Sequence, residues 1–166
     1  RQRSRWPRGW SGWLAPVADP WLLLGIIVLI GGFAFKIAAV PMHAYAGDVY
    51  QGAATPVTAL LAFVPKTSGF IAILKVLSVV GGEHWVVPEL VTNVLWAIAL
   101  LTMTVGNALG LLQQNIKRVF AYSSIAHSGY MLVGVTALVS ASQTVSHEQA
   151  GDIQTMALQG ILFYLL

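Results

Sequence analysis

The sequence is organised as long apolar segments separated by short polar turns, and this pattern restricts the fold more than any other feature. The segments lie at about residues 21–43, 56–80, 88–112, 117–140 and 153–166. A helix rises about 1.5 Å per residue, so each of the first four can cross a hydrocarbon core of about 30 Å. Since backbone polar groups in lipid must bond within their own segment, the pattern predicts membrane-spanning helices.

These segments predict an all-α fold, a polytopic transmembrane helix bundle with about five spans in this chain. Composition agrees, because 57% of the 166 residues are hydrophobic and only 9% are charged, whereas soluble domains carry about 25% charged residues. We expect residues 1–18, which are rich in Arg and Trp, to lie outside the membrane, and residues 19–166 to form the transmembrane domain. The chain does not begin with Met and stops inside an apolar run, so we take it as a fragment of a longer protein.

The charged residues indicate a lipid bilayer as a partner and argue against nucleic acid. The formal net charge is +3, but basic residues such as Lys75, Lys117 and Arg118 lie near the ends of apolar segments, where they anchor helices at the interface. The chain has no cysteine, which excludes disulfides, thiol catalysis and thiolate metal sites. The sequence also lacks a nucleotide fingerprint and metal-ligand spacing, so we expect no cofactor and no metal in this chain.

Lys66 is the charged residue whose position most strongly indicates a function. It lies roughly 15 Å into the segment at 56–80, near the middle of the bilayer, where a charged lysine costs about 2.5–3.5 kcal/mol. Pro65 precedes it, and Thr67 and Ser68 offer nearby hydroxyls. An amine held out of water gives up its proton more readily than one in water. We therefore predict that Lys66 carries protons, the alternative being a structural buried ion pair.

Lys36 and His43 form a second candidate group, in the segment at 21–43. Lys36 lies roughly 22 Å along the helix from Trp21, so it is either a snorkelling lysine or a proton-accepting amine in a hydrated channel. Pro41 removes a backbone hydrogen bond and predicts a broken helix near this point. His43 suits proton relay, or it is an interface residue after the end of a span.

His127 is a third candidate, in the segment at 117–140. It belongs to a polar stretch that faces other helices or a water cavity rather than lipid. That stretch is Ser123-Ser124-Ile125-Ala126-His127-Ser128-Gly129-Tyr130. A hydrogen-bonded packing role and a proton-relay role both remain open for His127.

Several stretches of the sequence resemble subunit N of respiratory complex I, an antiporter-like membrane subunit of NADH-quinone oxidoreductase. They are FKIAAVPMH (35–43), DVYQGA (48–53), TPVT (55–58), NIKR (115–118) and AYSSIAHSGY (121–130). The first pattern is shared with subunits L and M and with Mrp-type cation/proton antiporters. The DVYQGA and YSSIAHSGY stretches point to subunit N, and the resemblance extends from about residue 19 to the C-terminus.

The resemblance implies that the five segments are the seventh to eleventh helices of a longer subunit, with the seventh helix broken around Pro41. Lys36 and Lys66 would be the seventh-helix and eighth-helix lysines of a proton channel, and His43 the relay histidine between them. The resemblance also implies that the joint at 113–115 is cytoplasmic. The arginines near the N-terminus favour the opposite orientation, so the two indications conflict.

The predicted function is that of a proton-translocating membrane subunit of NADH:quinone oxidoreductase in the bacterial inner membrane. Other subunits would bind the NADH, flavin, iron–sulfur clusters and quinone, and this chain would have no redox centre. Antiporter-like subunit M and small subunit K are the expected neighbours. Two alternatives stay open: a subunit of a Mrp-type cation/proton antiporter, and a non-catalytic structural membrane subunit.

Overall fold

The computed structural model describes residues 20–82, 85, 87–144 and 147–165, and in these ranges every regular element is a helix. The helices are α2 (Pro20–Lys36), α3 (Ala44–Gly52), α4 (Thr55–Gly81), α5 (Glu89–Leu111), α6 (Ile116–Thr144) and α7 (His147–Leu165). The all-α prediction is confirmed, and α4 and α5 differ from the predicted spans by one residue at each end. The expected extramembrane segment at 1–18 lies outside the described residues.

Three helices in the described ranges are long and apolar enough to cross a membrane: Thr55–Gly81, Glu89–Leu111 and the Ile116–Ala141 part of α6. Large apolar side chains on these helices are exposed, among them Leu60, Ile71 and Leu100. Such extensive apolar exposure is unusual in a protein surrounded by water, but it is the normal outer surface of a helix bundle in lipid.

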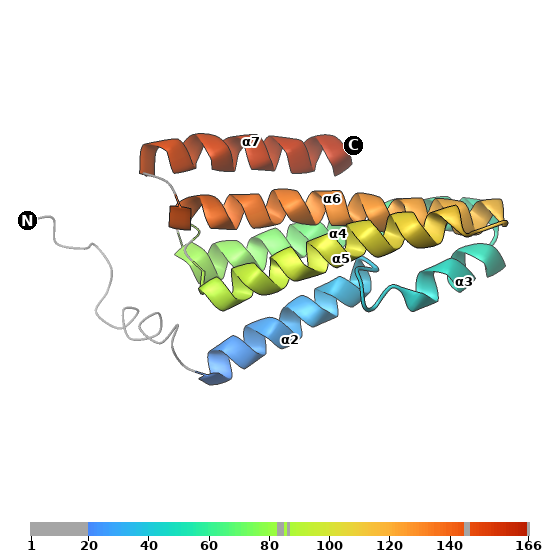
Figure 1. Cartoon of the computed structure of the whole chain (residues 1–166), viewed down its shortest axis with the longest axis horizontal. Helices are drawn as coiled ribbons and strands as arrows, with labels where there is room; N and C mark the ends of the chain where they lie inside the picture. Colours follow the sequence, from blue (N-terminus) through green and yellow to red (C-terminus); the bar gives the residue numbers. More distant parts are fainter. Residues whose placement is uncertain (1–19, 83–84, 86, 145–146, 166) are drawn as a thin grey trace, which may run out of the picture.

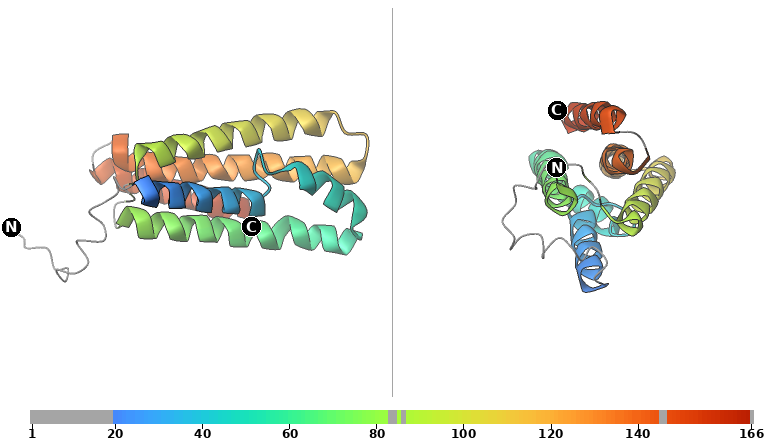
Figure 2. Two further views of the ribbon diagram at one scale, coloured as in Figure 1. Left: turned by 90° about the horizontal axis from the view of Figure 1, so that it is seen from below. Right: turned by 90° about the vertical axis from the view of Figure 1, so that its left-hand side faces the viewer.

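Helix α6 is the central helix of the bundle, since α3, α4, α5 and α7 all pack against it. Helices α4 to α7 run side by side in alternating directions (Figure 1), as their short connections predict. The end-on view in Figure 2 shows α7 and α2 on opposite sides of α6. Aliphatic side chains from α2, α4, α5, α6 and α7 form one core between them.

Two glycines allow α5 and α6 to approach each other closely. A Cβ atom at Gly106 would lie 2.8 Å from the backbone nitrogen of Ala126, and one at Gly129 would lie 2.8 Å from the backbone nitrogen of Met103. Small residues at such crossings let helix backbones pack tightly where lipid removes the hydrophobic driving force. This contact fixes α6, which carries several of the polar side chains described below, Ser124 and His127 among them.

The predicted break in the first span is present, but the helix ends earlier than Pro41. Helix α2 stops at Lys36, and Ala38 adopts a left-handed conformation with φ of 56°. The Ala39 N–H donates to the Ala34 carbonyl at 2.7 Å and the Ala38 N–H to the Phe35 carbonyl at 3.1 Å, which is the Schellman pattern of a helix end. The chain has therefore already left the helix when it reaches the proline.

Residues 47–52 are helical, although they lie in the polar, glycine-containing turn expected between the segments at 21–43 and 56–80. They belong to α3, which packs against α6 through buried Ala46 and Gly47. The missing side chain of Gly47 makes room for Tyr122, whose hydroxyl oxygen would lie 3.4 Å from a Cβ at that position. Packing against α6 thus stabilises a helix that local sequence preference does not predict. Helix α7 likewise begins at His147, before the predicted start at 153.

Side chains from neighbouring helices satisfy the backbone groups that the break exposes. The Val40 N–H donates to the Thr102 hydroxyl on α5 at 3.0 Å, and both residues are buried. The Tyr45 hydroxyl on α3 donates to the Phe35 carbonyl near the end of α2 at 2.9 Å, and the two aromatic rings stack. A helix broken inside a membrane requires such partners, because lipid supplies none.

Replacing Thr102 with valine is expected to destabilise the protein by about 1–3 kcal/mol, because the shape is kept while the buried Val40 N–H loses its acceptor. Thr104→Val is the matched control. Both hydroxyls donate to a carbonyl one turn earlier on α5, but that of Thr104 is exposed and serves no other segment. The measurement is the midpoint of thermal unfolding in detergent. Equal midpoints for the two variants would show that the Thr102 contact does not support the break.

Candidate functional site

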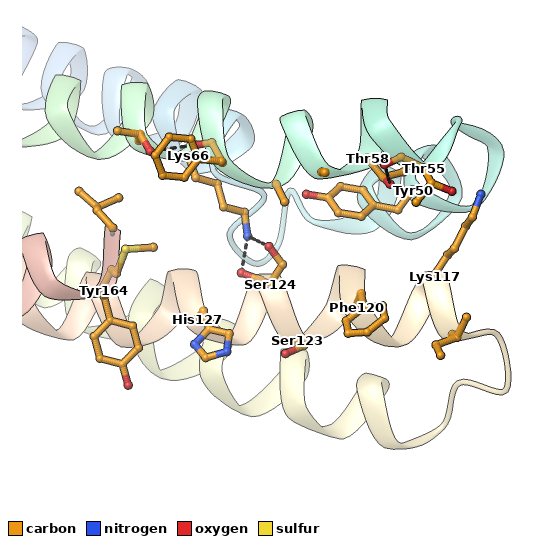
Figure 3. Close-up of a pocket in the computed structure, with 17 residues that line it drawn as sticks. Tyr50, Thr55, Thr58, Lys66, Lys117, Phe120, Ser123, Ser124, His127 and Tyr164 are labelled. Carbon is orange, nitrogen blue, oxygen red and sulfur yellow. Dashed lines mark hydrogen bonds between the residues drawn. The ribbon is translucent and has the colours of Figure 1, made fainter.

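Lys66 is buried in the middle of the bundle, as predicted, with 7% of its surface exposed. Its side chain extends from α4 toward α6 (Figure 3), where its Nζ atom donates to both the backbone carbonyl and the hydroxyl of Ser124. Among the described residues, no carboxylate pairs with it, and the ion pair found there joins Arg118 and Asp48. Lys66 is thus held by neutral oxygen atoms, which a charged or a neutral amine can both use.

The hydroxyl that reaches Lys66 comes from α6 and not from its sequence neighbours. Thr67 donates to the Phe63 carbonyl at 2.9 Å, and Ser68 donates to the Pro65 carbonyl at 3.0 Å, so both hydroxyls are used within α4. Ser124 is 58 positions away in sequence. The polar stretch around it predicted a surface that faces helices or water, but not this particular contact.

A large cavity lies on one side of Lys66. It has a volume of about 660 Å³ and is bounded mainly by α4, α6 and the end of α7. Its polar lining includes Tyr50, Lys66, Lys117, Ser123, Ser124, His127 and Tyr164 (Figure 3). A cavity of this size and lining has room for several water molecules near Lys66.

A smaller cavity lies on the other side of Lys66. Its volume is about 60 Å³, and its lining includes Lys36, Tyr45, Tyr50 and Lys66. The close approach of α4 to the end of α2 shapes this region, since a Cβ atom at Gly69 would lie 2.5 Å from the Ile37 side chain. Lys36 and Lys66, which are 30 positions apart in sequence, therefore border one small space.

Lys36 is exposed at the end of α2, yet it borders the same cavity as Lys66. The structure thus brings together the two lysines that the sequence singled out. Tyr45 and Tyr50, which were not predicted as site residues, join them from α3. Tyr50 belongs to the DVYQGA stretch that carried the family resemblance, but nothing in the sequence marked either tyrosine as a neighbour of the lysines.

His43 is half-buried at the N-terminal end of α3 and borders neither of the two cavities. Its Nδ1 atom is buried and has no hydrogen-bond partner in the described part of the chain. The helix does not continue from Lys36 to His43, so the two side chains do not share one helix face. A relay role for His43 stays a prediction.

His127 borders the larger cavity, together with Lys66 and Ser124. Its ring lies 5.8 Å from that of Tyr130 and 5.9 Å from that of Tyr164 on α7. These ring contacts agree with a packing role, and the position in the cavity agrees with a relay role. Both interpretations of the sequence therefore have a structural counterpart.

Lys117 and Arg118, which were expected to be interface anchors, connect the start of α6 to the chain around α3. Lys117 donates to the Ala53 carbonyl at 3.0 Å, and Arg118 forms an ion pair with Asp48. These contacts hold α3 against α6 and so help to place Tyr50 at the border of both cavities.

Residues 15–149 match the family described as "NADH:quinone oxidoreductase/Mrp antiporter, TM". NADH-quinone oxidoreductase subunit N of Myxococcus xanthus is 46% identical over 153 residues, which cover 86% of this chain and 29% of that protein. The subunit N of Trichlorobacter lovleyi is 45% identical over 148 residues (87% of this chain, 26% of that protein). Subunit N 2 of Symbiobacterium thermophilum is 43% identical over 159 residues (91% and 27%).

This chain therefore spans less than a third of the length of these relatives. The matched part contains α2 to α6 and only the first residues of α7. It includes the residues that line the smaller cavity and all those that line the larger one except Tyr164 and Leu165. Because the family match covers most of the sequence, this chain belongs to the NADH:quinone oxidoreductase/Mrp antiporter transmembrane family.

Proposed function

We propose that this chain is the central part of subunit N of a bacterial NADH:quinone oxidoreductase and that it moves protons across the membrane. The observation that carries the proposal is the position of Lys66, a buried amine between two cavities, held by neutral oxygens and without a carboxylate partner in the described residues. The relatives named subunit N of NADH-quinone oxidoreductase support this choice of complex.

The proton path begins at Lys36 on the smaller cavity and passes through Lys66 to the larger cavity, where His127 lies. At each step a charged donor loses one proton and a neutral acceptor gains it, so the total charge of the path changes only when a proton enters or leaves. A change in a neighbouring charge shifts the equilibrium of each step, because an amine shielded from water responds strongly to charges nearby. Water molecules in the larger cavity would complete the path to the surface.

This chain would carry no redox group. Electron transfer from NADH to quinone takes place in other subunits, which bind the NADH, flavin, iron–sulfur clusters and quinone. Antiporter-like subunit M and small subunit K are the expected neighbours in the membrane. The subunit would lie in the bacterial inner membrane as a multi-pass protein, with residues 19–166 in its transmembrane domain.

A Mrp-type cation/proton antiporter is the second candidate, since the matched family includes both kinds of protein. The test is to purify the full-length protein from its own membranes with its partners and to place the complex in liposomes. NADH:quinone oxidoreduction coupled to proton uptake is the expected result. A preparation without NADH-oxidising subunits that exchanges sodium for protons would overturn the proposal in favour of the antiporter.

A further inference from the structure

Tyr50 shares with Lys66 a position between the two cavities. Of the described residues, these two alone line both the smaller cavity and the larger one. Tyr50 comes from α3 and Lys66 from α4, so two separate helices supply the boundary. Figure 3 shows both side chains directed toward Ser124 on α6.

The chemistry of the two side chains differs in a way that matters for proton movement. Lys66 donates to the carbonyl and hydroxyl oxygens of Ser124. A charged lysine has three N–H donors and no acceptor. A second proton therefore cannot bind Lys66 while it is charged. The phenol of Tyr50 is both a donor and an acceptor, and Tyr50 lines the larger cavity together with Ser124.

We propose that Tyr50 is a proton-carrying residue that joins the smaller cavity to the larger one, with Ser124 linking its hydroxyl to Lys66. The Tyr50 oxygen accepts a proton from a donor in one cavity while its own proton passes to an acceptor in the other, so the phenol ends neutral as it began. This inference rests on the proposed function, since it assumes that protons pass through Lys66.

The other tyrosines near this region have different surroundings. The Tyr45 hydroxyl donates to the Phe35 carbonyl, and Tyr45 borders only the smaller cavity. Tyr122 packs against Gly47 and borders neither of the two. Tyr122 is therefore a matched control, because its hydroxyl belongs to the same bundle but lies off the proposed path.

The experiment compares Tyr50→Phe, Tyr122→Phe and Lys66→Ala in the complete complex, purified and placed in liposomes with a pH-sensitive dye inside. Tyr50→Phe is expected to slow NADH-driven proton uptake by about ten-fold or more, which is less than the roughly hundred-fold or larger effect of a group that transfers the proton in the rate-limiting step. It is also expected to increase the slowing caused by D₂O, whereas Tyr122→Phe keeps the normal rate and isotope effect. NADH oxidation with a soluble electron acceptor reports that the complex is intact.

Normal proton uptake and a normal isotope effect in Tyr50→Phe, with a defective Lys66→Ala, would overturn this inference and leave the proposed function standing. Normal uptake in Lys66→Ala would overturn the proposed function itself. If Tyr50→Phe prevents assembly, Ser124→Ala decides the question, with Ser78→Ala as its control on the exposed face of α4. Ser124→Ala removes the linking hydroxyl but keeps the carbonyl that holds Lys66, so unchanged uptake in that variant would also overturn the inference.

Discussion

Replacing Lys66 with alanine is expected to lower NADH-driven proton transport by about a hundred-fold, within the range lost when a proton-transferring side chain is removed. The reason is that the amine is the titratable group that borders both cavities and is also buried. Alanine leaves a neutral gap beside Ser124, and the hydroxyl and carbonyl there cannot bind a proton in place of the amine. The measurement is dye-reported proton uptake by liposomes that contain the purified complex.

Lys66→Arg separates proton transfer from a purely structural charge. An arginine keeps the positive charge and the hydrogen-bond donors but does not release its proton in a protein. If Lys66 carries protons, the arginine variant is as inactive as the alanine variant. Restoration of transport by arginine would instead support the structural alternative, in which a fixed charge at this place is sufficient.

Lys75→Ala is the matched control for both variants, because Lys75 lies on the same helix and is exposed. We expect assembly and proton transport to be normal in this variant. A loss as large as that of Lys66→Ala would show that removing any lysine from α4 damages the complex, and the Lys66 result would then say nothing about a proton path.

The helical fold could be predicted from the sequence because lipid removes the alternatives. A backbone in hydrocarbon must form its own hydrogen bonds, so an apolar run of sufficient length becomes a helix almost regardless of its residue preferences. The spans at α4 and α5 were therefore placed to within one residue at each end. The polar helix α3 was missed because its stability depends on packing against α6, which a local pattern does not contain.

The break after α2 could be predicted only in part. Pro41 marked the region, but the helix ends at Lys36 through the left-handed Ala38, a conformation that costs a non-glycine residue about 1–2 kcal/mol. Alanine carries no signal for such a turn. Contacts from other helices, such as the Thr102 hydroxyl on the Val40 N–H, support it, and these contacts join residues 62 positions apart.

The candidate site, like the fold, could be predicted from the sequence only in part. The two lysines were identifiable one at a time, because a charge in an apolar segment is costly wherever it lies. The residues around the lysines could not be identified in this way. Ser124 contacts Lys66, and Tyr50 lines the same cavities, only because of where α6 and α3 pack. His43 was grouped with Lys36 through a helix that does not continue, and the structure places it outside both cavities.

Lys36→Ala is expected to lower proton transport by about ten-fold or more, because Lys36 and Lys66 line the same small cavity and the proposed path runs from one to the other. Since residues that act as a unit are strongly non-additive, the double variant with Lys66→Ala should be no slower than Lys66→Ala alone. The measurements are the rates of proton uptake and quinone reduction in the three complexes. His43→Ala should cause a smaller loss than Lys36→Ala, because His43 borders neither cavity. The contrary result is a double variant that is slower than Lys66→Ala by the same factor by which Lys36→Ala slows the unmodified complex. Each lysine would then act separately, and the small cavity between them would not be a link in the path.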